Sequence, residues 1–262
     1  MAQKQNIALL TGRGGSVSIK DKNVMAVLGR PLMLYPLLAA QHAKLVDDIY
    51  LSTDGDKLKE VATQHKVKVI HRPPELAKPT SQHVECIQHA LDYLDAEGVE
   101  VNILVVLLCN VPTHDVGAID RAIAFLNQHP EYDSCVSISE MQENHPAIAK
   151  KAVDNPQPIK TAFENRVHYL TPFQENEGAV TRAEMRPCYF LTHSFWALRV
   201  ANGLIRGGQP PWDFMGRRIA GLKMDHGRDI HDVEDTAFSE CWLQSRGWSP
   251  YQSPYPQTHT SE

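Results

Sequence analysis

The sequence predicts an α/β fold built on a doubly wound, mixed sheet. Short apolar runs alternate with segments whose apolar residues recur at helical spacing, which is typical of repeated strand, loop and helix units. Residues 102–108 (NILVVLL) form an uninterrupted apolar run, as expected for a central strand covered on both faces. Residues 6–11 form another apolar run that ends in the glycine-rich segment GRGGS. Because ligands of such sheets bind at the carboxyl ends of the strands, we expect a site after this first strand.

Composition narrows the class of protein. The 262 residues suffice for one large domain with a smaller appendage, and 42% hydrophobic and 22% charged residues are ordinary for a globular protein. A formal charge of −5 without a basic stripe argues against a nucleic-acid partner, and no apolar run approaches a membrane span. The N-terminus reads as a first strand rather than a signal peptide. We therefore expect a cytoplasmic location, and five cysteines, an odd number without a CxxC pattern, predict free thiols in that reducing compartment.

The first half of the chain predicts five strands and four helices. We expect strands at 6–11, 48–52, 68–70, 102–108 and 134–139. The helices are expected at 32–44, 56–65, 84–96 and 115–128. Pro31 is placed to start the first helix, and Pro36 lies inside it. The loop between the third strand and the third helix holds three prolines, so it is expected to be exposed at a strand end, where ligand sites gather.

The second half predicts an insertion, a return to the sheet and a tail. Residues 140–185 have short β-like pieces and sparse apolar positions, so we expect an inserted region that packs on a second subunit. A strand and a helix are expected within 188–200, a last strand at 219–224 and a closing helix at 229–246 capped by Asp232. Residues 1–248 would then form one domain. Residues 249–262, rich in Pro, Ser, Thr and Gln, are expected to be a disordered tail.

The glycine-rich loop after the first strand predicts a phosphate site. Three glycines in four residues remove the Cβ atoms that would keep a ligand off the main chain, so backbone N–H groups can surround an anion. Arg13, Lys20 and Lys22 add positive charge to the same span. The segment fails the dinucleotide fingerprint, because Val17 stands where the third glycine is needed, and it also fails the P-loop pattern. Taken alone, the loop leaves the nucleotide open, with a glycine turn that binds no ligand as an equal alternative.

Four segments in order along the chain narrow that choice. They are GRGGSVSIKDKN, VLGRPLMLYPLLAA, IYLSTDGDKLKEVATQHKVKVIHRPPELAKPTSQHVECIQHAL and DIHDVED. Together they resemble the cytidylyltransferases that activate sialic acid and related nonulosonic acids as CMP-sugars. The resemblance implies a Rossmann-like (GT-A-like) nucleotidyltransferase fold and transfer of CMP from CTP to a 2-keto sugar acid with release of pyrophosphate. It also implies Mg²⁺, with Mn²⁺ as the alternative ion, and a homodimer formed through a small inserted region, which would fall at 140–185.

The resemblance also implies roles for individual residues. Catalytic roles are implied for Arg13, Lys22 and Asp229. Nucleotide binding is implied for Gly12, Gly14, Gly15, Ser16, Lys20, Asn23 and Arg72, with Asn23 and Arg72 near the cytosine. Arg186 corresponds to a residue next to the sugar, and Asp229 and His231 correspond to the metal site. These residue types suit the chemistry, because guanidinium groups bind phosphate and carboxylate in a forked geometry and carboxylates bind Mg²⁺.

Several motif positions depart from the family pattern. Val17 replaces a lysine, for which Lys20 is the expected substitute; Cys109 replaces a glutamine, Cys188 an asparagine, and His231 an aspartate. Three readings stay open: a divergent synthetase for a sugar acid, a nucleotidyltransferase that uses a sugar phosphate and another NTP, and a nucleotide-binding relative without turnover. The retained arginines, lysine and aspartate favour the first reading.

Overall fold

The computed structural model describes residues 4–16, 18–140, 146, 150–153, 169–172 and 186–255. The chain divides into two compact units, one made of residues 1–138 and 191–262 and the other of residues 139–190. Val17 and most of the predicted insertion at 140–185 lie outside the described residues. The two units are described separately below.

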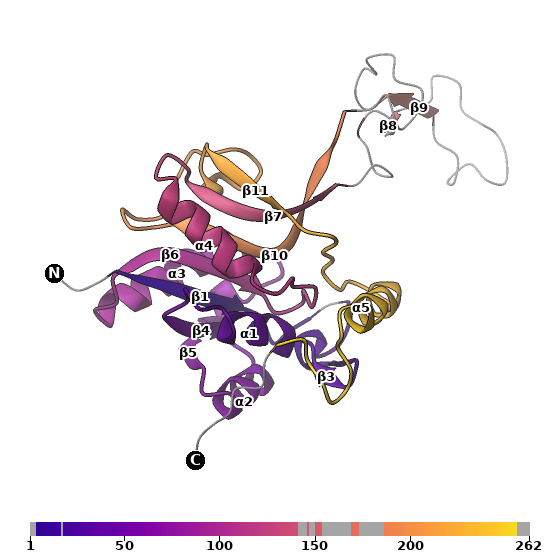
Figure 1. The fold of residues 1–262 in the computed structure, drawn as a ribbon, viewed down its shortest axis with the longest axis horizontal. Helices are drawn as coiled ribbons and strands as arrows, with labels where there is room; N and C mark the ends of the chain where they lie inside the picture. Colours follow the sequence, from indigo (N-terminus) through magenta and orange to yellow (C-terminus); the bar gives the residue numbers. More distant parts are fainter. Residues whose placement is uncertain are drawn as a thin grey trace. The chain divides into compact units, whose positions relative to one another are not determined.

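The first unit is built on a seven-stranded sheet in the order β11-β7-β10-β6-β1-β4-β5 (Figure 1). Its strands are β1 (Gln5–Thr11), β4 (Asp48–Thr53), β5 (Lys68–His71), β6 (Val101–Leu108), β7 (Ser134–Glu140), β10 (Tyr189–Arg199) and β11 (Ile219–Lys223). β1 runs parallel to β4 and β6, β4 is parallel to β5, and β11 is parallel to β7. β10 is antiparallel to β6. This mixed sheet confirms the predicted fold class.

Helices cover both faces of the sheet. They are α1 (Leu34–Gln41), α2 (Asp56–Gln64), α3 (His83–Ala96), α4 (Ala118–Gln128) and α5 (Val233–Ser245), with short 3₁₀ turns η1 (Lys22–Val24), η2 (Pro74–Leu76) and η4 (Asp213–Met215). Along β1, Ala8 and Leu10 join the apolar cluster of α1, α2, α4 and α5, whereas Ile7 and Leu9 join the cluster of α3 and η4. This alternation follows from the two-residue period of a strand and produces a doubly wound sheet.

One predicted helix starts later than expected, and another is a strand. Pro31 lies in the short strand β3 (Arg30–Pro31), which pairs with β2 (Ala26–Val27), and the helix begins only at Leu34. Pro36 therefore falls in the first turn of α1, where its missing N–H has no intrahelical partner to lose. Residues 188–200 form no helix, because β10 occupies residues 189–199 as one long strand. Its side chains enter the two clusters alternately, with Phe195 in the first and Trp196 in the second.

The second unit contains an antiparallel pair, β8 (Lys150–Val153) and β9 (Tyr169–Pro172). The expected role of this region in dimerisation stays a prediction.

The end of the chain packs more than its composition indicates. Tyr255 is 5% exposed, and its ring lies 5.7 Å from that of Trp248 and 4.6 Å from that of His42. The expected disordered tail is therefore wrong for residues 249–255, where two aromatic rings anchor a Pro-rich segment on the core. Residues 256–262 lie outside the described residues.

The structure also tests the predictions on disulfides and membrane spans. All five cysteines are free, as predicted. Across the described residues, no helix combines the length and the apolar character needed to span a bilayer.

Candidate functional site

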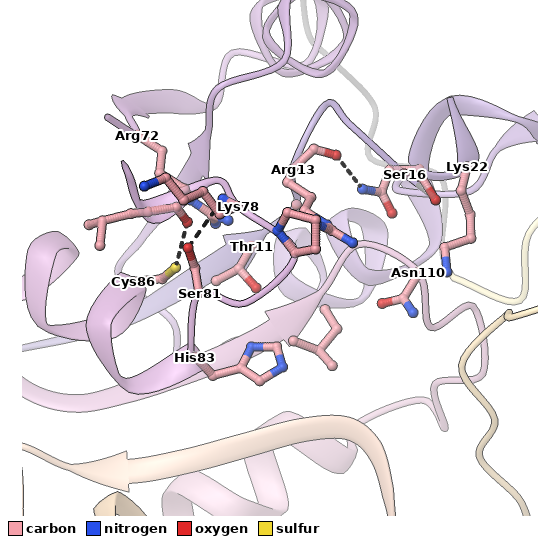
Figure 2. A pocket seen from close by; sticks show the side chains of 15 residues that line it. Thr11, Arg13, Ser16, Lys22, Arg72, Lys78, Ser81, His83, Cys86 and Asn110 are labelled. Carbon is pink, nitrogen blue, oxygen red and sulfur yellow. Dashed lines mark hydrogen bonds between the residues drawn. The ribbon is translucent and has the colours of Figure 1, made fainter. Parts of the chain in front are cut away.

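A cavity of about 260 Å³ opens at the carboxyl ends of the parallel strands β1, β5 and β6. Its described lining comprises Thr11, Gly12, Arg13, Ser16, Lys22, Asn23, Arg72, Leu76, Lys78, Pro79, Ser81, His83, Cys86, Leu108 and Asn110. Figure 2 shows Arg72, Lys78, Ser81 and Cys86 gathered at one end and Lys22 with Asn110 at the other, with Arg13 and Thr11 between them. Four of these side chains are cationic, and none of the described lining residues is Asp or Glu. The arrangement therefore favours an anionic ligand.

The glycine-rich loop is held in place by side chains from outside it. The N–H of Gly14 donates to Oδ1 of Asp54 at 2.8 Å, and Nδ2 of Asn23 donates to the carbonyl of Arg13 at 3.1 Å. A Cβ atom on Gly14 would lie 2.8 Å from the Cα of Gly55, so only glycine fits at position 14 of the loop. The N–H of Gly14 is therefore already engaged by a carboxylate, which leaves the other amides of the loop for the anion that the sequence predicts.

The half-buried Arg13 and the buried Arg72 carry charge into the cavity without a described carboxylate partner. Nη1 of Arg13 is buried and has no hydrogen-bond partner among the described residues. Arg72 is 5% exposed, and its Nη2 and Nε donate to the carbonyl oxygen and Oγ of Ser52 at 2.8 and 3.2 Å. Because neutral oxygens hold Arg72, its positive charge is available to a ligand.

Lys22 links the cavity to the segment before α5. Its Nζ donates to the carbonyl of Ile230 at 2.7 Å, and the N–H of Ile230 donates to the carbonyl of Asn110 at 2.9 Å. Burial lowers the pKa of Lys22, while the negative charge of Asp229 acts in the opposite direction. These contacts bring residues 229–231 beside the cavity, although neither Asp229 nor His231 is among its described lining residues.

The predicted metal residues form a pair. Oδ2 of Asp229 lies 3.1 Å from Nε2 of His231. Within the described residues there is no group of three or more His, Cys, Asp or Glu side chains that could hold a metal ion. Asp232 and Asp235 instead cap α5, as predicted for Asp232, whose Oδ1 accepts the N–H of Asp235 at 2.9 Å. One carboxylate beside a cationic cavity still fits Mg²⁺, which commonly takes one or two carboxylates and completes its shell with phosphate oxygens and water.

Other predicted residues lie elsewhere. Gly14 and Gly15 belong to the loop but not to the described lining, and Lys20 is exposed in the turn that follows. Its substitution for the lysine missing at Val17 stays a prediction. Arg186 lies in the second unit, and its role also stays a prediction.

The structure adds cavity residues that the sequence did not indicate. Thr11, Lys78, Ser81, His83 and Asn110 all line the cavity. The Pro-rich loop before α3 was expected at a strand end, which was the available signal for Lys78 and Ser81. No sequence pattern showed that the first residue of α3 turns toward the loop.

Cys109 occupies a packing position beneath the glycine-rich loop. The side chain is fully buried, and a Cβ atom on Gly12 would lie 2.9 Å from its Sγ. Burial raises the pKa of the Cys109 thiol to about 12. The thiol is therefore protonated and unreactive at neutral pH, which indicates a structural cysteine rather than a nucleophile.

The comparison with known families covers most of the chain, including the glycine-rich loop. Residues 7–196 match the model of the family described as cytidylyltransferase. The chain belongs to the cytidylyltransferase family. The matched region contains Arg13, Lys22 and Arg72 and ends before Asp229.

Curated relatives of this cytidylyltransferase-family chain are N-acylneuraminate cytidylyltransferases. That of Streptococcus agalactiae serotype III is 28% identical over 145 residues, 54% of this chain and 33% of the relative. That of Escherichia coli O18:K1:H7 is 26% identical over 150 residues, 57% and 34% of the two chains. That of Oncorhynchus mykiss is 38% identical over 87 residues, 33% and 20% of the two chains. The chain thus matches about a third or less of the length of these relatives.

Solved structures show the same fold at low sequence identity. CMP:2-keto-3-deoxy-manno-octonic acid synthetase complexed with CTP aligns at a TM-score of 0.64 and 12% identity over 93% of this chain and 100% of that chain. A 4-diphosphocytidyl-2C-methyl-D-erythritol synthase aligns at 0.60 and 12% identity over 92% and 100%. These alignments confirm the predicted nucleotidyltransferase fold.

Proposed function

We propose that the chain transfers CMP from CTP to a 2-keto sugar acid, resembling sialic acid or an eight-carbon analogue, and releases pyrophosphate. The cavity carries this proposal: it has four cations, one of them with a buried unpaired Nη1 at Arg13, and no described acidic lining residue. A triphosphate supplies the missing negative charge. The printed names of the curated relatives support N-acylneuraminate-type acceptors.

The cavity residues would act mainly by alignment and charge neutralisation. Lys22 and Arg13 would bind phosphate oxygens, and Arg72, held rigidly by Ser52, would contact the nucleotide at the other end of the cavity. Nucleotidyl transfer is in-line displacement at phosphorus, so fixed positive groups that face the developing charge lower its barrier. Arg186 is proposed to contact the sugar acid.

A Mg²⁺ ion is proposed at Asp229, with Mn²⁺ as the alternative ion. When bound, it would neutralise charge on the triphosphate and orient it. The carboxylate of Asp229 suits either ion, whereas the imidazole of His231 suits softer metals and is the weaker candidate. We also propose a homodimer formed through the second unit and a cytoplasmic location, the latter supported by the five free thiols.

Pyrophosphate release decides the proposal. The chain is incubated with CTP, Mg²⁺ or Mn²⁺ and a panel of eight- and nine-carbon 2-keto sugar acids, and thermal shift is measured with ATP, GTP, UTP and CTP. A nucleotide at about a hundred times its Kd stabilises the fold by about 2.7 kcal/mol. Release with an acid and selective stabilisation by CTP are expected. Binding of CTP without release would favour the relative without turnover, a response to another NTP would favour a sugar-phosphate nucleotidyltransferase, and neither binding nor release would refute the proposal.

A further inference from the structure

We propose that His83 is the base that accepts the proton of the attacking acceptor hydroxyl. This inference rests on the proposed nucleotidyl transfer and adds a catalytic residue to it. An attacking hydroxyl must lose its proton as the new oxygen–phosphorus bond forms, and a positioned side chain that receives this proton accelerates such a step.

The composition of the cavity leaves few groups for that role. Among the described lining residues, the ionisable side chains are Arg13, Lys22, Arg72, Lys78, His83 and Cys86. The first four are cations at neutral pH and have no lone pair to offer. Burial raises the pKa of the Cys86 thiol, so it stays protonated. His83 is therefore the one described lining residue with a basic nitrogen at neutral pH.

His83 is also oriented by its neighbours. It is the first residue of α3, whose start is fixed by a capping box in which the N–H of Gln82 donates to Oε2 of Glu85 at 2.8 Å. The imidazole meets the buried ring of Trp196 edge to face, with ring centroids 5.2 Å apart and planes at 86°. Figure 2 shows the ring projecting from the start of α3 into the space below Arg13 and Thr11. Contact with a rigid indole on one side leaves the cavity side of the ring for a ligand.

The electrostatic surroundings keep this imidazole neutral. The charged and titratable groups around it are His193, Arg72, Asp229, Arg13, Lys22 and Lys78. His83 is an exposed residue, and its ring is shielded from water where it packs on Trp196. This partial loss of water is the first cause that lowers the pKa of His83; His193 and Arg72 lower it further, while Asp229 raises it. The net direction is below the ordinary value of 6.5, so His83 can accept a proton at neutral pH.

The step balances without any further reactant. The acceptor oxygen bonds to the α-phosphorus of CTP as the bond from that phosphorus to the pyrophosphate oxygen breaks. The hydroxyl proton passes to a ring nitrogen of His83, which becomes imidazolium and later releases the proton to water. The imidazolium would also lie beside the departing polyanion, which favours its formation in the transition state.

The test compares His83→Gln with His193→Gln in pyrophosphate release across pH. His193 is the matched control, because its ring also meets Trp196 edge to face, at 5.7 Å, but is absent from the described lining. We expect kcat of His83→Gln to fall about 10²–10⁴-fold, the usual contribution of a general base, with the Kd for CTP within about twofold. The natural chain and His193→Gln should both keep an acidic limb in kcat/KM with a midpoint below 6.5, and His83→Gln should lose it. Added imidazole should partly restore His83→Ala.

The outcomes separate this inference from the proposed function. If the natural chain releases pyrophosphate and His83→Gln keeps both its kcat and the acidic limb, the inference is overturned and the proposed function stands. If His193→Gln loses activity to the same extent as His83→Gln and imidazole rescues neither His→Ala variant, both histidines act by holding the Trp196 ring in place. The base is then another group, and the inference is overturned. If the natural chain releases no pyrophosphate with any acid, the proposed function fails, and this inference fails with it.

Discussion

Asp54 holds the glycine-rich loop, so its removal is predicted to weaken CTP binding. Its Oδ1 accepts the N–H of Gly14 at 2.8 Å in a half-buried position. A hydrogen bond to a charged group contributes about 1.5–3 kcal/mol, and partial exposure reduces this to about 1–2 kcal/mol here. In Asp54→Ala, CTP binding would have to order the loop without this hydrogen bond. If the full loss appears in the binding free energy, the Kd for CTP should rise about 5- to 30-fold.

Isothermal titration with CTP measures the effect, and Asp47→Ala is the matched control. Oδ2 of Asp47 accepts the N–H of Asn6 at 2.7 Å, which is the same kind of bond at the amino end of β1, away from the cavity. Both variants should lower the melting temperature, but only Asp54→Ala should weaken CTP binding. An unchanged Kd would refute the argument. A tighter Kd would also refute it, because it would mean that the carboxylate competes with phosphate for the Gly14 amide.

Three further predictions concern stability and reactivity. Burial lowers the pKa of His114 to about 4 from an ordinary 6.5, so the free energy of unfolding is highest above pH 6.5 and falls by about 3 kcal/mol as the pH falls to 4. Denaturant titrations at pH 7 and pH 4 should show this loss. An equally large loss in His114→Gln would contradict the assignment to His114. Gly227→Ala places a Cβ atom 2.2 Å from the Cβ of Thr192, so the segment before α5 must shift. The rate of pyrophosphate release should then fall at least about tenfold. A rate equal to that of the natural chain would show that this segment can shift without loss of activity. Iodoacetamide at pH 8 should modify the exposed Cys241 and spare Cys109 until the chain is denatured, as measured by peptide mass spectrometry. Labelling of Cys109 in the folded chain would contradict its assignment as a buried, protonated thiol.

The strands were largely predictable because burial marks them in the sequence. β6 was expected at 102–108 and spans Val101–Leu108, since a strand covered on both faces is apolar throughout. The same property caused the error at β10, because a continuous apolar run does not distinguish a doubly covered strand from a buried helix. Only the pairing of β10 with β6, nearly a hundred residues earlier, settles its conformation.

The site was predictable where the resemblance aligned whole motifs. Arg13, Lys22 and Arg72 all line one cavity, although they come from the loop after β1 and the end of β5. The hydrogen bond from Gly14 to Asp54 joins residues 40 positions apart, so no spacing pattern in the sequence predicts it. The direction of His83 likewise depends on how α3 packs against Trp196, which propensity and spacing do not determine.

Three of the cavity cations, Arg13, Lys22 and Arg72, keep their charge available to the proposed polyanion. Lys22 bonds to the carbonyl of Ile230 and Arg72 to the oxygens of Ser52, while Nη1 of Arg13 has no described partner. Neutral oxygens fix Lys22 and Arg72 without cancelling their charge. The cost is mutual repulsion, seen in the contribution of Arg13 to the lowered pKa of Lys22. A bound triphosphate would remove that repulsion and meet donors already in position, so part of its binding free energy is built into the fold before the ligand arrives.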